Sequence, residues 1–519
     1  MNLNLHRGLR IAEGGLRPNG RDAACQFPRP AMREDGVVSS SGGHRPPLQR
    51  RRGVSGSVLI VVMWIAFGVV GMALYFAHSM EVNMIAADNQ LASFQADQAI
   101  ASGALYASNI LANVIQMNMQ GNAQYNFAPC MLPSTNFYKT AGVRVGDGWF
   151  WYIGRDTNGT LFSRQSDIPT FCLVDEASKV NINNTKLYGS PDSTTSTNLL
   201  QGLPQMTLQL LSAMYDWSTT NTTASMNGAK DATYQSLNPP YLCKMTNFDT
   251  IGELRMVYGM GLDYLFWEDA NLNGALDPNE NDGPILPPND NGNGLLDSGI
   301  FEYVTVYTQE ATNIGGTNRV SVTSLSTLTN FLATNNPTIY SEISPKLRTM
   351  TAAPTSLLDF IIKTGITEQD FITIEPYLMG SNKVGLINVN TATATTLGCI
   401  PGIGTDSVMG LGSVNAQNIL AFRQSVPSRC NSVYWLIDAM SNLGTNAILA
   451  AGPWVTAHSW QYTADIAAVG HNGRGYRRVK FVFDCSSGAP LIVYRQDLTY
   501  LGWALGKKLH DQLLVGTLR

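Results

Sequence analysis

The sequence has few charged residues and none of the patterns that mark common enzyme classes. Only 14% of its 519 residues are charged, and the formal net charge is −4. Because there is no basic surplus, the composition does not favour nucleic acid as a partner. The six histidines form no HExxH motif, and neither GxSxG nor a P-loop occurs. The adjacent carboxylates Asp175 and Glu176 alone make no acid–base pair, and we expect a hairpin-entry or capping role for them. We therefore expect a protein that is not an enzyme.

Cysteine is scarce, and no two cysteines have the CxxC or CxxxC spacing that is typical of zinc sites. Cys25 precedes the longest apolar run, and an even number of cysteines follows it, which favours disulfides in an oxidising compartment. The spacing does not determine the pairing. Our first guess joins Cys399 to Cys430, and buried unpaired thiols are the alternative. The disulfide candidates are Cys130, Cys172, Cys243, Cys399, Cys430 and Cys485.

The longest apolar run covers residues 58–77 and contains no charge. A helix of ~20 residues at ~1.5 Å rise spans a bilayer core of ~30 Å. Arg45 and Arg50–Arg52 precede the run, so the positive-inside rule predicts a cytoplasmic N-terminus, one membrane crossing, and the bulk of the chain outside the cytoplasm. A cleaved secretory signal is the competing interpretation, although its apolar core is usually only ~7–15 residues long.

The residues on either side of this run predict a leader and a long helix. Residues 1–49 are rich in Arg, Gly, Pro and Ser, and we interpret 1–56 as a cytoplasmic leader that is removed. No proline occurs from 54 to 119, and apolar residues recur at helical spacing after the run. We predict one helix over 57–120, apolar in its first half and amphipathic in its second.

The rest of the chain predicts an α+β fold in which a helical block interrupts an antiparallel sheet. Alternating residues predict strands in 121–175, including LFSRQ after the turn at 157–159, and again in 456–519. Helical spacing dominates the block between them, 176–455, apart from a loop rich in Asp, Asn, Gly and Pro at 266–302.

The inserted block contains two similar segments, VNINNT at 180–185 and INVNTA at 387–392. The second leads into Pro401-Gly402-Ile403-Gly404, a helix-hairpin-helix signature in which glycine permits the positive φ of a tight turn. Hairpins of this type can bind a DNA phosphate through their amides. However, no Lys or Arg occurs between 386 and 422, and Asp406 follows the hairpin. Phosphate affinity depends on such cations, so we favour a structural hairpin.

Residues 269–280 have the spacing of an EF-hand calcium loop, with oxygen side chains at loop positions 1, 3, 5, 9 and 12 and Gly at position 6. The seventh position would contribute a backbone carbonyl. The alternative is an ordinary surface loop that is rich in Asn and Gly. The predicted ligands are Asp269, Asn271, Asn273, Ala275, Asp277 and Glu280.

A weaker copy of the calcium loop follows. It has Asn at position 1 and Ile300 at position 12, where Glu302 could substitute. No flanking EF helices are evident, so we expect isolated Ca²⁺ loops, one or two of which bind. The predicted ligands of the second loop are Asn289, Asn291, Asn293, Leu295, Asp297 and Glu302.

Taken in order, these features resemble the minor pseudopilin K of type II secretion systems, the general secretion pathway protein K family. The resemblance runs from about Arg50 to the last strands. It rests on the fragments RRRGVSGSVLIVVMW, DEASKVNINNT, LLSAMYDW, KDATYQSLNPPYLCK, FDTIGELRMVYGM, FEYVTVYT and GLINVNTATATTLGCIPGIG.

The resemblance implies a pilin-like fold with an inserted helical domain, and processing by prepilin peptidase with methylation of the new N-terminus. Alignment of the apolar run favours cleavage after Gly56, which leaves Ser57 first; Gly53 and Val54 are the alternative. The fifth mature position, glutamate in most pilins, is Val61. That carboxylate would pair with the terminal amine of a neighbouring subunit in the membrane, so its absence suits a subunit at the filament tip.

The resemblance also implies partners and a function. The partners would be minor pseudopilins I and J, other pseudopilins, the inner-membrane assembly platform and secreted cargo, and members of the family bind calcium. We therefore expect a tip subunit that initiates the pseudopilus and takes part in protein export across the outer membrane. The alternative is a membrane-anchored periplasmic DNA receptor of the competence type, which only the hairpin favours.

Overall fold

The computed structural model describes residues 57–119, 138–184, 199–314, 316–381, 383–406 and 413–514. The chain divides into two compact units, residues 1–76 and 77–519. The first long helix, α1 (Ser57–Met119), begins in the first unit and continues into the second.

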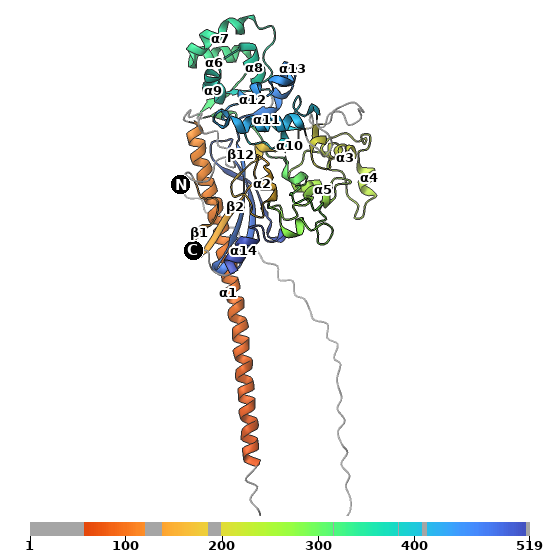
Figure 1. The fold of residues 1–519 in the computed structure, drawn as a ribbon, viewed down its shortest axis with the longest axis vertical. Coiled ribbons are helices and arrows are strands. Elements are labelled where there is room, and N and C mark those ends of the chain that lie inside the picture. Colours follow the sequence, from red (N-terminus) through yellow and green to blue (C-terminus); the bar gives the residue numbers. More distant parts are fainter. Residues whose placement is uncertain are drawn as a thin grey trace, which may run out of the picture. The chain divides into compact units, whose positions relative to one another are not determined.

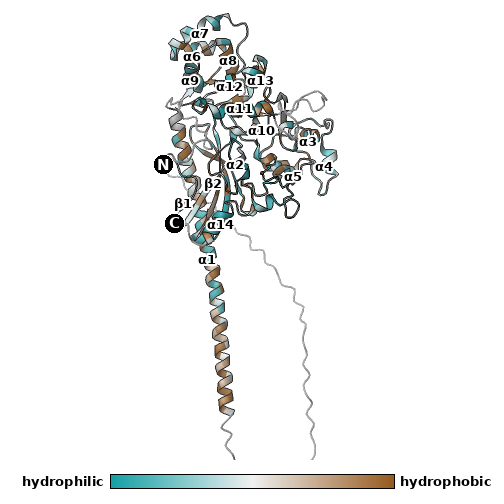
Figure 2. Ribbon diagram, viewed as in Figure 1, coloured by the Kyte–Doolittle hydropathy of each residue, from teal (hydrophilic) through white to brown (hydrophobic). Residues whose placement is uncertain are grey.

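The part of α1 in the first unit is apolar and exposed. It contains an 18-residue window with a mean hydropathy of 2.5, none of which is buried. Figure 2 shows the corresponding hydrophobic colour along this part of the helix. A helix of this length and composition fits a single-pass membrane protein.

The second half of α1 packs closely on a sheet. Alanines dominate its buried face, among them Ala96, Ala99 and Ala107, all fully buried. A Cβ on Gly103 would lie 3.1 Å from Ile466, and the Tyr152 hydroxyl donates to the Gly103 carbonyl at 2.6 Å. Small residues on the buried face therefore allow the helix to approach the sheet.

The sheet is antiparallel, with the strand order β1-β2-β12-β13-β14, and β3 also pairs with β12 (Figure 1). In the sequence, β1, β2 and β3 precede the inserted block, and β12, β13 and β14 follow it. Their bounds are β1 Val143–Val145, β2 Gly148–Ile153, β3 Val174–Asp175, β12 Gln461–Val469, β13 Arg477–Asp484 and β14 Leu491–Asp497.

The two faces of the sheet differ in character. The face toward α1 is apolar and includes Phe150, Ile466 and Phe481. Alternate residues point to the opposite face, where Asp465 on β12 and Lys480 on β13 are directly paired. The predicted mixture of helices with an antiparallel sheet is confirmed.

The block between β3 and β12 has its own large apolar core. Its helices are α3 Leu208–Ser218, α4 Asp231–Gln235, α5 Leu262–Phe266, α6 Leu325–Asn335, α7 Pro337–Thr349, α8 Leu357–Thr364, α9 Glu368–Ile374, α10 Ala394–Leu397, α11 Val414–Ser425, α12 Trp435–Ala439 and α13 Thr445–Ala451. The last helix, α14 (Lys507–Leu514), follows the sheet strands.

The two similar segments adopt the same local structure. β4 (Val180–Asn181) pairs in parallel with β5 (Val304–Thr305), and β10 (Ile387–Asn388) pairs in parallel with β11 (Val455–Thr456). In each segment the first Asn accepts a hydrogen bond from the amide two residues later, at 2.9 Å in one and 3.0 Å in the other. Further short strands are β6 Asn313–Ile314, β7 Thr317–Asn318, β8 Val320–Ser321 and β9 Leu378–Met379.

One predicted strand is wrong. The LFSRQ segment forms the helix α2 (Leu161–Gln165). The Thr160 side chain caps this helix by accepting a hydrogen bond from the Ser163 amide at 3.2 Å. A capping threonine therefore outweighs the alternation of side chains over five residues.

Candidate functional site

The first asparagine-rich loop, residues 269–280, turns around a buried carboxylate. Asp269 is fully buried, and its two oxygens accept hydrogen bonds from the Asn273 and Gly274 amides at 2.9 and 3.0 Å. Asn271 and Asn273 each accept a hydrogen bond from the amide two residues later. Gly274 has φ +69°, which an L side chain rarely adopts. The spacing predicted from the sequence therefore corresponds to a real turn.

The carboxylates at the end of this loop face inward. Asp277 accepts hydrogen bonds from the side-chain amides of Asn271 and Asn273, at 2.7 and 3.1 Å. Glu280, only 2% exposed, accepts from the Ala270 and Asp277 amides. Three carboxylates thus converge on one short loop.

This convergence makes the loop electrostatically unfavourable on its own. Burial raises the pKa of Asp269, although the nearby Arg155 opposes the rise. Burial and the charge of Asp269 raise the pKa of Glu280. Burial also raises the pKa of Asp277. A positive charge inside the loop would relieve all three shifts.

Two arginines from the sheet hold the loop from outside. Arg478 on β13 is fully buried, forms a two-point ion pair with Asp465, and donates to the carbonyls of Asn271 and Leu272. Arg155, just after β2, also donates to the Leu272 carbonyl at 2.8 Å. The loop is therefore part of the packed interface between the sheet and the inserted block.

The second loop repeats the pattern in a more exposed setting. Asn289, Asn291 and Asn293 are all exposed. Asn291 and Asn293 donate to Asp297, and each accepts from the amide two residues later, that of Asn293 or Leu295. The second loop therefore keeps the asparagine turns and the bonds to its last aspartate, without the burial of the first loop.

The carboxylate that closes the second loop is not the one predicted. Glu302 points to Arg155 and pairs with it at 2.6 Å. Instead Glu268, 1% exposed, accepts from the Asn291 and Asp297 amides. Glu268 lies more than twenty residues before these amides in the chain, so a search for ligands after the loop misses it. Asp297 also pairs with Arg164.

The donor set of the first loop fits a hard cation. Carboxylate, amide and carbonyl oxygens are the ligands that Ca²⁺ prefers. Within the described ranges, no three His, Cys, Asp or Glu side chains are arranged to hold a metal by themselves. Asparagine and backbone oxygens would therefore have to complete any coordination shell.

Asp175 connects the sheet to the second repeat segment. As predicted, it has a capping role: its side chain accepts from the Ala177 amide at the start of a short 3-10 helix. It also accepts from Asn388, Thr391 and Ser459. Burial raises the pKa of Asp175 to about 6, although these hydrogen bonds oppose the rise. The contacts to Asn388 and Thr391 span more than 200 residues, and the sequence alone does not reveal them.

The hairpin at 401–404 is packed inside the protein. A Cβ on Gly402 would lie 2.2 Å from the Ala447 carbonyl of α13, and Gly402 has φ +82°. Ile403 is fully buried, and the Ile403 and Gly404 amides donate to the Ile400 carbonyl. Pro401 is partly exposed. The Ile403 and Gly404 amides therefore already donate hydrogen bonds within the protein and are not available to a phosphate.

The nearest arginine after the hairpin is not available to a phosphate either. Arg423 is fully buried and donates to the carbonyls of Val389, Ala392 and Thr157. Its guanidinium joins backbone segments to one another. The geometry therefore favours the structural interpretation of the hairpin.

The cysteine pairing is corrected by the structure. Cys399 and Cys430 are free thiols, as are Cys243 and Cys485. The Cys399 thiol lies against the Thr395 carbonyl, and that of Cys430 lies against the Val426 carbonyl, both at 3.5 Å. Each thiol contacts a backbone carbonyl four residues earlier. The two cysteines belong to the same helical part of the chain but are not bonded to each other. The Cys172 thiol lies 3.8 Å from the Arg155 carbonyl.

Several predicted positions lie outside the described residues. These are Gly53, Val54, Gly56 and Cys130. Ser57 is the first residue of α1.

Comparison with known proteins finds a family that matches part of the chain. Residues 178–265 match the family described as Type II secretion system (T2SS), protein K. This segment is similar to type II secretion system protein K. The matched segment begins just before β4, ends in α5 and contains three of the fragments quoted above, so the predicted resemblance is confirmed.

A search of solved structures finds the GspK-GspI-GspJ complex of the type 2 secretion system from enterotoxigenic Escherichia coli. The identity is 8%, the TM-score is 0.32, and the alignment covers 77% of this chain and 97% of that chain. No curated protein matches the chain significantly. The similarity to the protein K family therefore rests on a segment of the inserted block.

Proposed function

We propose that this protein is a minor pseudopilin at the tip of a type II secretion pseudopilus, where it initiates assembly and takes part in protein export. The observation that carries the proposal is the match of residues 178–265 to the protein K family in a chain that also has a long apolar N-terminal helix. In a pilin-like subunit, such a helix would anchor the protein in the inner membrane before assembly and enter the filament core afterwards.

The arrangement of the second unit is consistent with this proposal. Half of α1 packs on an antiparallel sheet, and the helical block is inserted between β3 and β12. We propose that this is a pilin-like fold with helix-hairpin-helix elements in the insertion. The partners would be minor pseudopilins I and J, other pseudopilins, the assembly platform and prepilin peptidase.

An exposed apolar strand supports contact with other subunits. β14 pairs only with β13 among the described strands, and Leu491, Ile492 and Val493 are each more than half exposed. Edge strands with apolar side chains invite pairing with another chain. We propose that this edge contributes to the contacts with other minor pseudopilins.

We further propose that the first asparagine-rich loop binds one Ca²⁺ and that the second binds a further Ca²⁺ more weakly. The buried carboxylates of the first loop and their raised pKa values support this order. Calcium would stabilise the loop that Arg155 and Arg478 connect to the sheet.

Processing at the N-terminus is the direct test of the pseudopilin proposal. The membrane-extracted protein is analysed by intact mass and N-terminal sequencing, with and without co-expressed prepilin peptidase. We expect an N-methylated start at Ser57, or at Val54, only when the peptidase is present. An uncut N-terminus would leave a plain signal anchor, and cleavage after Ala77 would indicate a secreted protein.

The DNA-receptor alternative has its own test. We expect duplex binding to disappear at physiological salt, because the hairpin is buried and carries no cation. Binding that survives this salt concentration would favour the receptor.

A further inference from the structure

A cavity lies between the polar face of the sheet and the inserted block. Its sheet side includes Thr463 and Asp465 on β12, Lys480 on β13, and Tyr494 and Gln496 on β14. These residues form cross-strand rows, with Lys480 opposite both Asp465 and Gln496. The period-two alternation of three strands therefore builds one wall of the cavity.

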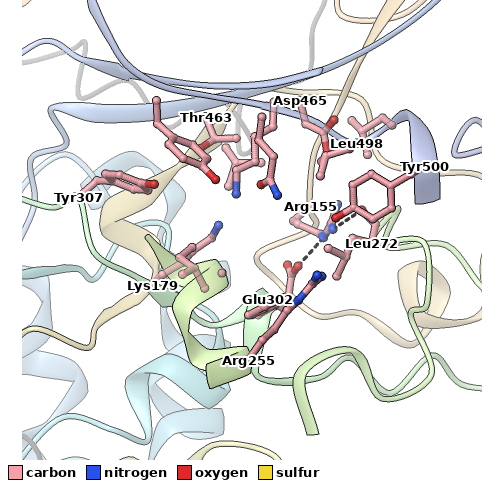
Figure 3. A pocket seen from close by; sticks show the side chains of 18 residues that line it. Arg155, Lys179, Arg255, Leu272, Glu302, Tyr307, Thr463, Asp465, Leu498 and Tyr500 are labelled. Atoms are coloured by element: carbon pink, nitrogen blue, oxygen red, sulfur yellow. Dashed lines mark hydrogen bonds and ion pairs between the residues drawn. The ribbon is translucent and has the colours of Figure 1, made fainter. Parts of the chain in front are cut away.

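The opposite wall comes from segments far apart in the chain. It includes Arg155, Lys179, Arg255, Phe301 and Glu302. Figure 3 shows the side chains of Lys179 and Tyr307 directed toward the centre of the cavity from one side, with Arg155, Arg255 and Glu302 on the other. The volume is about 140 Å³. A cavity of roughly 150 Å³ holds one benzene-sized group, so this one has room for a group about the size of a single side chain.

Cations outnumber carboxylates in the lining. Arg155, Lys179, Arg255 and Lys480 are the four cations, and Glu302 and Asp465 are the two carboxylates. Arg155 pairs with Glu302, and Asp465 pairs with Arg478 behind it. Lys179 pairs with Glu176 at 3.3 Å. Arg255 and Lys480 are the two lining cations outside these pairs.

Those two cations have no ionic partner among the described residues. Arg255 lies over the rings of Phe266 and Phe301, at 5.3 and 5.8 Å from their centroids, and no carboxylate lies within 4.0 Å of it. Lys480 likewise has no carboxylate within 4.0 Å in the described part of the chain. Burial and the charge of Lys179 lower the pKa of Lys480 to about 8, although the carboxylates of Glu176 and Asp465 oppose the fall.

A third polar group in the cavity is also unsatisfied. The Tyr307 hydroxyl is buried and has no hydrogen-bond partner in the part of the chain that the structure describes. A buried hydroxyl without a partner destabilises the protein, so a ligand that accepts from it is favoured. Its ring packs against that of Tyr494, 5.6 Å away. The lining thus combines two cations and a hydroxyl that can donate with aromatic and aliphatic surface.

We propose that this cavity binds a carboxylate attached to an apolar body of single-residue size. The carboxylate accepts from Lys480, Arg255 and Tyr307, and the apolar body contacts Phe301, Leu272 and the neighbouring rings. A monoanion suits the site better than a phosphate dianion, because Glu302 and Asp465 offset half of the lining cations. Such a ligand could be a free small acid or the C-terminal residue of a polypeptide. This inference does not depend on the proposed tip function.

The test measures binding to the full-length protein in detergent by titration calorimetry. The probes are 4-methylpentanoate and an acetylated tetrapeptide that ends in a free leucine, each compared with its neutral C-terminal amide. We expect the acids to bind at least about tenfold more tightly than the amides, since a charge-assisted hydrogen bond is stronger than one to a neutral amide. Tighter binding of the peptide identifies a polypeptide terminus as the ligand, and tighter binding of the free acid identifies a small molecule.

Substitutions locate the site. Lys480→Gln should weaken acid binding about tenfold and leave amide binding unchanged, because it removes one charge-assisted donor. Arg255→Gln, at an exposed residue, should weaken acid binding several-fold. The matched control is Arg495→Gln: Arg495 is an exposed β14 residue between Tyr494 and Gln496 and therefore on the other face.

Two results would overturn the proposal. One is equal binding of each acid and its amide. The other is acid binding that Lys480→Gln and Arg255→Gln leave intact, or that Arg495→Gln weakens as strongly.

Discussion

The two asparagine-rich loops have nearly the same side chains in different surroundings. In the first loop, Asp269 and Asn273 are fully buried. In the second, Asn291 and Asn293 are exposed, yet their Asx turns match those of the first loop. Local sequence therefore sets the turns, while the surroundings decide how strongly the carboxylates interact.

The difference comes from what each loop packs against. The first loop lies against the sheet, where Arg478 and Arg155 bind its carbonyls. In the second loop, Asp297 pairs with Arg164, whose side chain is 39% exposed. Electrostatic interactions weaken with exposure to water, so equal substitutions should have unequal effects in the two loops.

The largest expected effect is the removal of Arg478. Arg478→Met should lower the free energy of unfolding by about 3–5 kcal/mol, because it leaves Asp465 buried without its partner. Chemical denaturation of the full-length protein measures this value. Arg474→Met is the control: Arg474 pairs with Asp88 at an exposed position, and the cost should be at most about 1 kcal/mol. Equal losses in the two variants would show that the sheet does not hold the first loop.

The second largest effect is expected from calcium binding, which should depend on the first loop more than on the second. At a free Ca²⁺ concentration of 100 times the Kd, one bound ion should raise the free energy of unfolding by about 2.7 kcal/mol. A chelator should reverse the increase. Asp269→Asn should abolish most of it, and Asp297→Asn should retain most of it. An increase that Asp297→Asn abolishes and Asp269→Asn retains would reverse the proposed order of the loops.

The two closing glutamates allow a finer comparison. Burial and neighbouring charge raise the pKa of Glu280, so its neutral form is favoured without calcium. Glu280→Gln should therefore cost only about 1 kcal/mol in chelator, roughly one hydrogen bond, yet remove the response to calcium. Glu268→Gln should leave the response of the first loop intact. Calorimetric titration with Ca²⁺ distinguishes the two, and a normal response in Glu280→Gln would contradict the assignment.

The smallest effect is expected in the second loop without calcium. Asp297→Asn should change the free energy of unfolding by at most about 1 kcal/mol, because the pair with Arg164 is partly exposed. Thermal unfolding in chelator measures the change. A loss as large as that of Arg478→Met would mean that the second loop is as firmly packed as the first.

The elements that can be predicted from the sequence are those whose signal is local. An apolar stretch without proline predicts α1, alternation predicts β12, β13 and β14, and the spacing of Asp269, Asn271 and Asn273 predicts the first turn. In each case neighbouring residues supply the hydrogen bonds or the periodicity, so the pattern is visible along the chain.

Which distant groups meet depends on how the chain packs in three dimensions. This packing placed Glu268 rather than Glu302 at the second loop and left Cys399 and Cys430 unpaired. It also buried the hairpin against α13 and brought Arg255 and Lys480 to one cavity. These outcomes depend on packing between segments that are up to hundreds of residues apart. The spacing of residues along the chain does not reveal that packing.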